Sequence, residues 1–248
     1  MAAAIKLHRH AVRRREGRFL AEGPNLVGEA WRRGLVSDVF VTESALARFG
    51  SMLADVPVHL VTDRAAQALS DTVTPVGLVA VCSVSETTLD DVLAGSPRLV
   101  AVAVGISEPG NAGTLIRVAD AMGADAVVLT GHSVDPYNGK CLRASVGSIF
   151  SIPVVSATDA ASAVTALRDA GLRVLATTVD GEVSLDHAEL SAPTAWLFGP
   201  EAHGLAPDLA ALASARVHIP MPGSAESLNV ASAAAICLYQ SARAHRAS

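Results

Sequence analysis

The sequence predicts an α/β protein that consists of a small N-terminal α/β unit and a larger C-terminal unit built on a parallel sheet. Short, continuous apolar runs such as Leu99–Val104 and Ala126–Leu129 are typical of strands that helices cover on both faces. These runs alternate with helical segments, which is the pattern of repeated βα units. A polar stretch at residues 84–97 ends in Gly-Ser-Pro and separates the two units. We therefore place the boundary near residue 90, with domains at residues 1–90 and 98–248.

The N-terminal unit is predicted from alternating helix and strand signals. Pro24 suits the first turn of a helix, and Gly34 follows its end. Ser44 is a candidate N-cap for the helix that follows the first strand. We predict strands at Val36–Val41, Val58–Val61 and Val76–Val81, and helices at Ser44–Ala54 and Asp63–Leu69.

The C-terminal unit is predicted from a longer series of the same kind. Asn111 and Ser227 stand at two expected helix starts, where their side chains can cap free N–H groups. We predict strands at Leu99–Val104, Ala126–Leu129, Leu172–Thr177, Ala195–Phe198 and Val217–Ile219. We predict helices at Asn111–Met122, Pro136–Ala144, Asp159–Ala170 and Ser227–Ala244, and one helical turn in the linker.

The composition excludes several classes of protein. The chain has 248 residues, of which 50% are hydrophobic and 17% charged, so it is globular rather than disordered. It has no run of 18 apolar residues, so we expect no membrane span. The first twenty residues lack the apolar segment of a secretory signal. The three cysteines are far apart and show no metal-ligand spacing, so we expect reduced thiols, no metal and a cytoplasmic location.

The charges are unevenly distributed. The net charge is -5, which argues against a generally basic nucleic-acid binder. Residues 1–33, however, contain eight Lys or Arg and three acidic residues, whereas the rest of the chain contains 11 basic and 21 acidic residues. A basic end on an acidic body suits local contact with phosphates. A solvated, frayed terminus explains the same charges equally well.

Two segments near the C-terminus carry the clearest motifs. One is Trp196-Leu-Phe-Gly-Pro-Glu-Ala-His-Gly-Leu205, and the other is Ile219-Pro-Met-Pro-Gly-Ser-Ala-Glu-Ser-Leu-Asn-Val-Ala-Ser-Ala-Ala-Ala235. Each begins with a short apolar run and then turns through Gly or Pro. Two such loops at the carboxyl ends of neighbouring parallel strands would form one pocket, where open α/β folds bind ligands.

Together with Asn111-Ala-Gly-Thr-Leu-Ile-Arg117, these segments resemble the SpoU/TrmH family of RNA ribose 2′-O-methyltransferases. The resemblance covers about residues 98–245, with three motifs in the family's order. It implies a SPOUT domain with a trefoil knot, S-adenosylmethionine as cofactor, a homodimer and methyl transfer to a 2′-hydroxyl of structured RNA. It also implies the catalytic residues Asn111, Arg117, Glu201, Ser227 and Asn229.

The resemblance assigns further residues to the cofactor site, namely Gly199, Ile219, Met221 and Leu228. Thr178, at the end of an apolar strand, is expected to line the same pocket. The sequence departs from a common form of the motif because Pro200 stands where Asn is frequent. Arg117 is a poor candidate base, since the pKa of arginine lies above about 12. We therefore interpret it as a phosphate and alkoxide ligand; taken alone, Asn111 could be a plain helix cap and Arg117 a surface charge.

Two segments are expected to contact RNA. The stretch Arg18-Phe-Leu-Ala-Glu-Gly-Pro-Asn-Leu-Val-Gly-Glu-Ala-Trp31 resembles the substrate-binding domain of ribosomal-RNA members of the family. That domain recognises folded RNA by shape, and unpaired RNA is the usual target of specific recognition. Three residues apart on one predicted helix, Lys140 and Arg143 share a face, although Lys140 alone could be a solvated charge. The expected RNA contacts are Arg9, Arg13, Arg14, Arg18, Lys140 and Arg143.

The leading hypothesis is a 2′-O-methyltransferase that acts on large-subunit (23S) ribosomal RNA. A tRNA 2′-O-methyltransferase and a non-catalytic RNA-binding or assembly factor of the same fold are the alternatives. A dinucleotide-dependent enzyme is disfavoured, because no GxGxxG follows the strand at Leu99–Val104.

Overall fold

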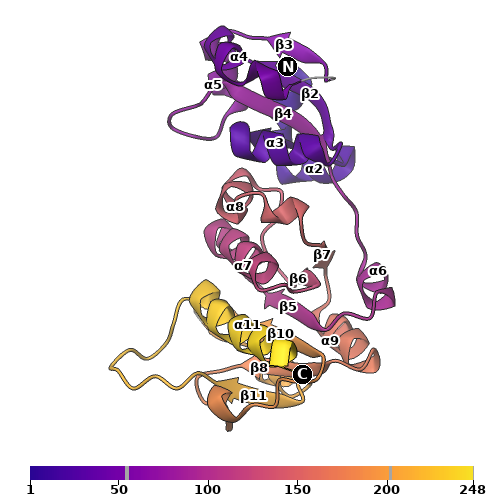
Figure 1. Cartoon of the computed structure of the whole chain (residues 1–248), viewed down its shortest axis with the longest axis vertical. Coiled ribbons are helices and arrows are strands. Elements are labelled where there is room, and N and C mark those ends of the chain that lie inside the picture. Colours follow the sequence, from indigo (N-terminus) through magenta and orange to yellow (C-terminus); the bar gives the residue numbers. More distant parts are fainter. Residues whose placement is uncertain (54–55, 201–202, 248) are drawn as a thin grey trace.

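The computed structural model describes residues 1–53, 56–200 and 203–247, and these form two sheets joined by a polar linker (Figure 1). The N-terminal unit (residues 1–83) contains a sheet with the strand order β1-β4-β2-β3. The C-terminal unit (residues 99–247) contains a second sheet with the order β7-β6-β5-β10-β8-β11-β9, in which every pairing is parallel. The predicted fold class, a small α/β unit followed by a parallel α/β unit, is confirmed.

The N-terminal sheet is mixed. Its strands are β1 Arg18–Glu22, β2 Val36–Val41, β3 Val58–Leu60 and β4 Leu78–Ser83. The edge strand β1 and the central strand β2 both run antiparallel to β4, and β3 runs parallel to β2. The helices are α1 Ala2–Ile5, α2 His10–Glu16, α3 Pro24–Arg32, α4 Glu43–Phe49 and α5 Asp63–Leu69.

Helix α4 and strand β1 differ from the sequence-based expectations for the N-terminal unit. Helix α4 is capped by Thr42, whose hydroxyl accepts from the Ala45 N–H, so Ser44 is not the cap. The helix ends at Phe49 because a 3₁₀ turn follows at Gly50–Met52. Strand β1 was not predicted; it buries Phe19 and Ala21 on one face in a period-2 pattern that only five residues display.

The C-terminal sheet contains a strand at each of the five predicted positions, and its strands β7 and β9 were not predicted. Its strands are β5 Leu99–Val104, β6 Ala126–Thr130, β7 Val154–Ala157, β8 Arg173–Thr177, β9 Val183–Ser184, β10 Thr194–Phe198 and β11 Ala215–His218. The helices are α7 Pro109–Ala121, α8 Gly139–Ser145, α9 Ala160–Asp169, α10 Pro207–Ala210 and α11 Val230–Ala247. The linker holds α6 Leu89–Ala94, which Thr88 and Asp91 start with a capping box.

Helices cover both faces of the C-terminal sheet, which explains its continuous apolar strands. Along β5, Leu99, Ala101 and Ala103 pack with α7, α8 and α11. The alternate residues Val100 and Val102 pack with α9 and α10 on the opposite face. The buried Trp196 indole of β10 also donates a hydrogen bond to the Ser241 hydroxyl at 2.9 Å, which fixes α11 on the sheet.

Helices α7 and α8 approach each other at Gly113. A Cβ atom at this position would lie 2.3 Å from the Cys141 carbonyl oxygen and 2.7 Å from the Ala144 Cβ. Any larger side chain would therefore push α8 away from α7. Helix α8 faces the N-terminal unit (Figure 1), so this contact also sets where that unit sits.

The two units share one apolar core. Phe19 of β1 is fully buried, and its ring lies 4.7 Å from the Tyr137 ring and 6.0 Å from the Phe150 ring, centroid to centroid. Burial raises the pKa of Tyr137 to about 12, so its hydroxyl stays protonated and donates to the Ser85 carbonyl in the linker. The aromatic contact therefore joins β1, the linker and the loop before α8.

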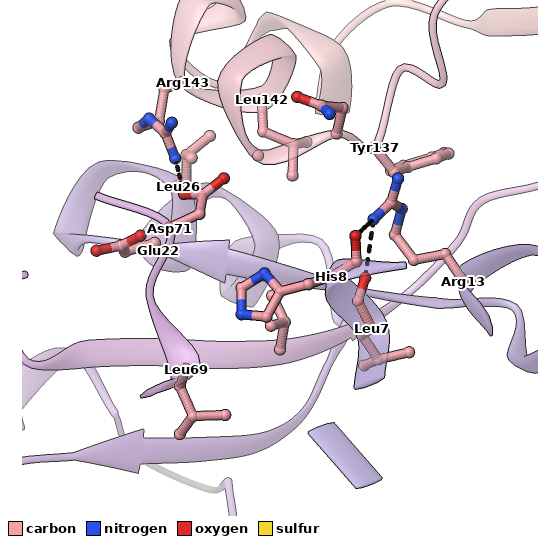
Figure 2. Close-up of a pocket in the computed structure, with 13 residues that line it drawn as sticks. Leu7, His8, Arg13, Glu22, Leu26, Leu69, Asp71, Tyr137, Leu142 and Arg143 are labelled. Atoms are coloured by element: carbon pink, nitrogen blue, oxygen red, sulfur yellow. Dashed lines mark hydrogen bonds and ion pairs between the residues drawn. The ribbon is translucent and has the colours of Figure 1, made fainter. Parts of the chain in front are cut away.

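Arg13 adds a buried ion pair to this interface. It is 7% exposed, and its guanidinium contacts the Asp135 carboxylate at 2.5 and 2.7 Å. The same guanidinium donates to the carbonyls of Leu7 and His8, as Figure 2 shows. On the other side of this interface, Arg143 of α8 forms an ion pair with Asp71 (Figure 2).

All three cysteines of the chain are buried. They lie on β4, α8 and α11, and burial raises the pKa of each thiol to about 12.

Within the described ranges, no helix has both the length and the apolar character to cross a bilayer.

We expect Arg13→Ala to lower the free energy of unfolding by about 3 kcal/mol or more, because it leaves the poorly exposed Asp135 carboxylate without its partner. The matched control is Arg15→Ala, which removes an exposed pair with Glu16 and should leave the free energy of unfolding nearly unchanged, because solvent screens such a pair. Urea unfolding of the two variants measures both values. Equal costs would show that the Arg13–Asp135 pair does not hold the two units together.

Candidate active site

A cavity of about 500 Å³ opens at the carboxyl ends of β8, β10 and β11. This is the edge at which open parallel sheets bind ligands. Loops after the three strands form its wall, and the residues before α11 close it. It gathers all five predicted cofactor residues and one predicted catalytic residue: Thr178, Gly199, Ile219, Met221, Leu228 and Ser227.

The cavity combines apolar surface with a few polar groups. Val217, Leu205 and Ile219 contribute apolar side chains. The Thr178 hydroxyl lies beside Asp180 and lowers the pKa of that carboxyl. Its Oγ1 atom is nevertheless buried without a partner of hydrogen-bond geometry among the described residues. A buried hydroxyl of this kind is suited to a polar ligand atom.

The loop after β10 is tightly folded. A Cβ atom on Gly199 would lie 2.6 Å from the Leu205 backbone nitrogen and 2.7 Å from the Gly204 carbonyl carbon. The Gly204 N–H donates to the Pro200 carbonyl at 2.9 Å and closes the turn. Glu201, a predicted catalytic residue, lies outside the described residues.

A pair of asparagines joins the first and third motifs. The Asn229 Nδ2 donates to the Asn111 Oδ1 at 3.0 Å. The Asn229 Oδ1 accepts from the N–H groups of Ala231 and Ser232 at 2.9 and 3.3 Å, which fixes the orientation of the amide. One side chain thus caps α11 and ties its start to the first turn of α7.

These contacts correct two predicted helix starts. Helix α11 begins at Val230, so Ser227 lies in the preceding loop and Asn229 caps the helix. Helix α7 begins at Pro109, and its cap is Glu108, whose carboxylate accepts from the Gly110 N–H at 3.2 Å. The sequence contains a signal for this earlier start, because proline is favoured at the first helical position.

The predicted RNA contacts on α8 are engaged in ion pairs. The Lys140 Nζ lies 2.5 Å from the Glu108 carboxylate, and this hydrogen bond holds the pKa of Glu108 below its usual range. Arg143 is paired with Asp71 of the N-terminal unit (Figure 2). Neither acidic partner is predictable from the sequence, since no local pattern links residues so far apart.

The N-terminal arginines fall into two groups. Arg9 and Arg14 are exposed, and Arg18 is half-buried with a 3.6 Å ion pair to Glu16. Arg13 is buried against Asp135, so a phosphate could reach it only if the interface opened. Among the described residues, no group of three or more His, Cys, Asp or Glu side chains could hold a metal ion.

Comparison with known proteins agrees with this geometry. The model of the SpoU rRNA Methylase family matches residues 98–239, and the model of the MRM3-like substrate binding domain matches residues 3–80. The 23S rRNA (guanosine(2553)-2'-O)-methyltransferase RlmP of Bacillus subtilis is 36% identical over 236 residues, which cover 94% of this chain and 92% of that protein.

The chain belongs to the SpoU rRNA methylase family. Two solved structures also match nearly the whole chain. The SpoU methyltransferase AviRb from Streptomyces viridochromogenes, in complex with AdoMet, has a TM-score of 0.90 and 30% identity, covering 100% of this chain and 97% of its own. The AdoMet-bound rRNA methyltransferase from Sinorhizobium meliloti has a TM-score of 0.86 and 29% identity, covering 98% and 93%.

Arg117 stands apart from the other SpoU motif residues within this chain. It is exposed on α7, and no described residue forms a hydrogen bond or ion pair with its side chain. Arg117 lies six residues after Asn111, which on an α-helix places it about 9 Å further along the axis and about 120° around it. The Arg117 side chain is not among the described residues that line the cavity of its own chain.

We expect Gly199→Ala to lower the free energy of unfolding by about 1–3 kcal/mol, because the added Cβ overlaps the Gly204–Leu205 backbone. The matched control is Gly223→Ala in the loop before α11, where a Cβ has no neighbour within 4 Å and should change stability by less than about 0.5 kcal/mol. Urea unfolding measures both. Equal effects would mean that the loop after β10 accommodates a side chain.

Proposed function

We propose that this protein transfers a methyl group from S-adenosylmethionine to a ribose 2′-hydroxyl of structured RNA, with 23S ribosomal RNA as the substrate. The observation that carries the proposal is the gathering of the predicted cofactor residues in one cavity, next to the Asn111–Asn229 pair. Membership of the SpoU family and the similarity to a Bacillus subtilis 23S rRNA methyltransferase support it.

The cavity fits S-adenosylmethionine, which supplies a methyl group on a positively charged sulfur. Ile219, Met221 and Leu228 offer apolar surface for the adenine ring. The buried Thr178 hydroxyl provides a hydrogen-bonding group without another partner of good geometry among the described residues. Gly199 lets the turn after β10 fold tightly against the cavity.

The remaining motif residues act on the RNA. Asn111 and Asn229 position the ribose, because precise placement supplies much of the rate of such a displacement. Arg117 holds the adjacent phosphate and stabilises the alkoxide as the hydroxyl loses its proton. Its guanidinium is too weak a base to take that proton. Glu201 and Ser227 complete the catalytic set that the family resemblance implies.

The N-terminal unit supports binding of the RNA. We assign residues 1–90 to an RNA-binding domain and residues 98–248 to the methyltransferase domain; the two family models, which match residues 3–80 and 98–239, support this assignment. Arg9, Arg14 and Arg18 provide accessible charge for phosphates. Lys140 and Arg143 join them by exchanging their carboxylate partners for phosphate, since both ion pairs are partly exposed.

A homodimer with a knotted core completes the proposal. Ile236 and Tyr239, three residues apart on α11, are 37% and 50% exposed and together offer apolar surface on one side of the helix. Arg117 lies outside the cavity of its own chain, so a partner subunit could receive it. The trefoil knot rests on the family resemblance, and the packing of α11 against α7, β5 and β10 is consistent with it.

The function is tested with labelled S-adenosylmethionine, unmodified 23S rRNA and tRNA transcripts, and mass spectrometry of the nucleosides. We expect a 2′-O-methylnucleoside in 23S rRNA.

The variant Asn229→Asp keeps an oxygen that caps α11 but loses the donor to Asn111. We therefore expect kcat/KM to fall at least about tenfold, while the free energy of unfolding changes by less than about 0.5 kcal/mol.

If Asn229→Asp loses activity and stability to the same extent, the Asn229 side chain acts only as a helix cap. Methylation of tRNA alone would select the alternative substrate. Cofactor binding without transfer to either RNA would favour a non-catalytic RNA-binding factor.

Dimerisation is tested by sedimentation. We expect the wild-type protein to sediment at twice the chain mass and Ile236→Glu to sediment as a monomer, because a buried unpaired charge would oppose the interface. The control is Val73→Glu, which changes a residue that is 97% exposed in the N-terminal unit and should leave the dimer intact. A wild-type monomer with full activity would refute this part of the proposal.

A further inference from the structure

A second cleft, of about 370 Å³, lies between the two units. One wall comes from α2, with His10 and Arg14, and another from the linker, with Val84 and Glu86. The C-terminal unit supplies the floor from the ends of β6 and β7 and the loops that follow them. Its residues there include Leu129, Ser133, Val134, Ser156 and Thr158.

This cleft opens at the same edge of the sheet as the cofactor cavity. In the order β7-β6-β5-β10-β8-β11, the cleft lies at β7 and β6, and the cavity lies at β10, β8 and β11. With strands about 4.8 Å apart, the two are separated by roughly 15 Å. The Asn111–Asn229 pair lies between them, because Asn111 follows β5.

The chemistry of the cleft matches a nucleotide. Leu129, Val84 and Val134 offer apolar surface for a base, and the hydroxyls of Ser156 and Thr158 can bond polar edges. Arg14 and His10 lie on one wall, where a phosphate would contact them.

Two acidic residues also line the cleft. The charge of Asp135 is compensated by Arg13 at 2.5 Å. Glu86 is the remaining carboxylate among the lining residues, and it can accept from a base N–H.

The course of the RNA favours the same occupant. Helix α2 belongs to the basic segment at residues 1–33, which we propose to contact phosphates, and it also forms a wall of the cleft. An RNA strand that passes from this segment to the Asn111–Asn229 pair crosses the cleft. A volume of about 370 Å³ lies within the range of about 300–1,000 Å³ that is typical of small-molecule sites.

We infer that this cleft binds an unpaired nucleotide that flanks the methylated one in the RNA substrate. The inference rests on the proposed function for the identity of the substrate. The base lies on the apolar floor, and its phosphate is held by Arg14 and His10. A nucleotide drawn into the cleft leaves the RNA stack, which fits the preference of RNA-binding proteins for unpaired bases. The cleft thereby selects where along the RNA the reacting ribose is placed.

The test uses an unmodified 23S rRNA transcript that contains 4-thiouridine, with RNA affinity measured by filter binding and crosslinked peptides identified by mass spectrometry. We expect Arg14→Ala and the cleft-filling Ser156→Trp each to weaken RNA binding about tenfold. Their affinity for S-adenosylmethionine should stay within about twofold, because neither residue lines the cofactor cavity. Crosslinks should fall within residues 10–17 and 129–137.

Matched controls separate the cleft from general effects. Arg64→Ala removes an exposed charge on α5, and Ser162→Trp adds the same bulk on the exposed side of α9; neither residue lines the cleft. Both should bind RNA as the wild type does. If the protein methylates RNA and the cleft variants bind like these controls, the cleft inference is overturned and the proposed function stands.

The same experiment also distinguishes failure of the proposed activity from failure of the cleft inference. If no RNA is methylated but wild-type crosslinks fall in the cleft and disappear in Ser156→Trp, the proposed activity fails and the nucleotide site stands. If the wild-type protein binds no RNA, both are overturned.

Discussion

The close approach of α7 and α8 at Gly113 is the constraint on which the rest of the structure depends. Because this glycine has no side chain, the backbone of α8 lies directly against α7. Helix α7 presents Asn111 to the start of α11 at one end, while α8 carries the residues that meet the N-terminal unit. The position of the Asn111–Asn229 pair and the orientation of the two units are therefore set by the same pair of helices. A shift of α8 would move both.

Strands were predicted correctly where burial follows a local pattern in the sequence. Leu99–Val104 was predicted with its observed bounds, because both faces of a central parallel strand are covered and its residues are all apolar. The predicted cofactor residues share one cavity because each follows a strand that ends at the same edge of the sheet. The helix starts at Asn111 and Ser227 were placed wrongly, since several neighbouring residues could cap and only the fold selects Glu108 and Asn229.

Long-range pairs account for most of what the sequence could not predict. Arg13 stands in a run of arginines that all look solvated, and its burial depends on Asp135, which is 122 residues away. Arg143 and Asp71 are 72 residues apart in the sequence. The basic segment consequently serves two purposes: Arg13 fixes the position of the N-terminal unit, and Arg9 and Arg14 stay exposed on the surface that this position creates.

The buried cysteines have a practical consequence. A thiol with a pKa of about 12 carries almost no thiolate at neutral pH, and the thiolate is the form that reacts with oxidants and alkylating reagents. The three thiols are also shielded sterically by the cores of both units. A single cysteine introduced at an exposed position would thus be the one that a maleimide dye modifies. The native chain can therefore be labelled at one introduced cysteine without first replacing the three buried ones.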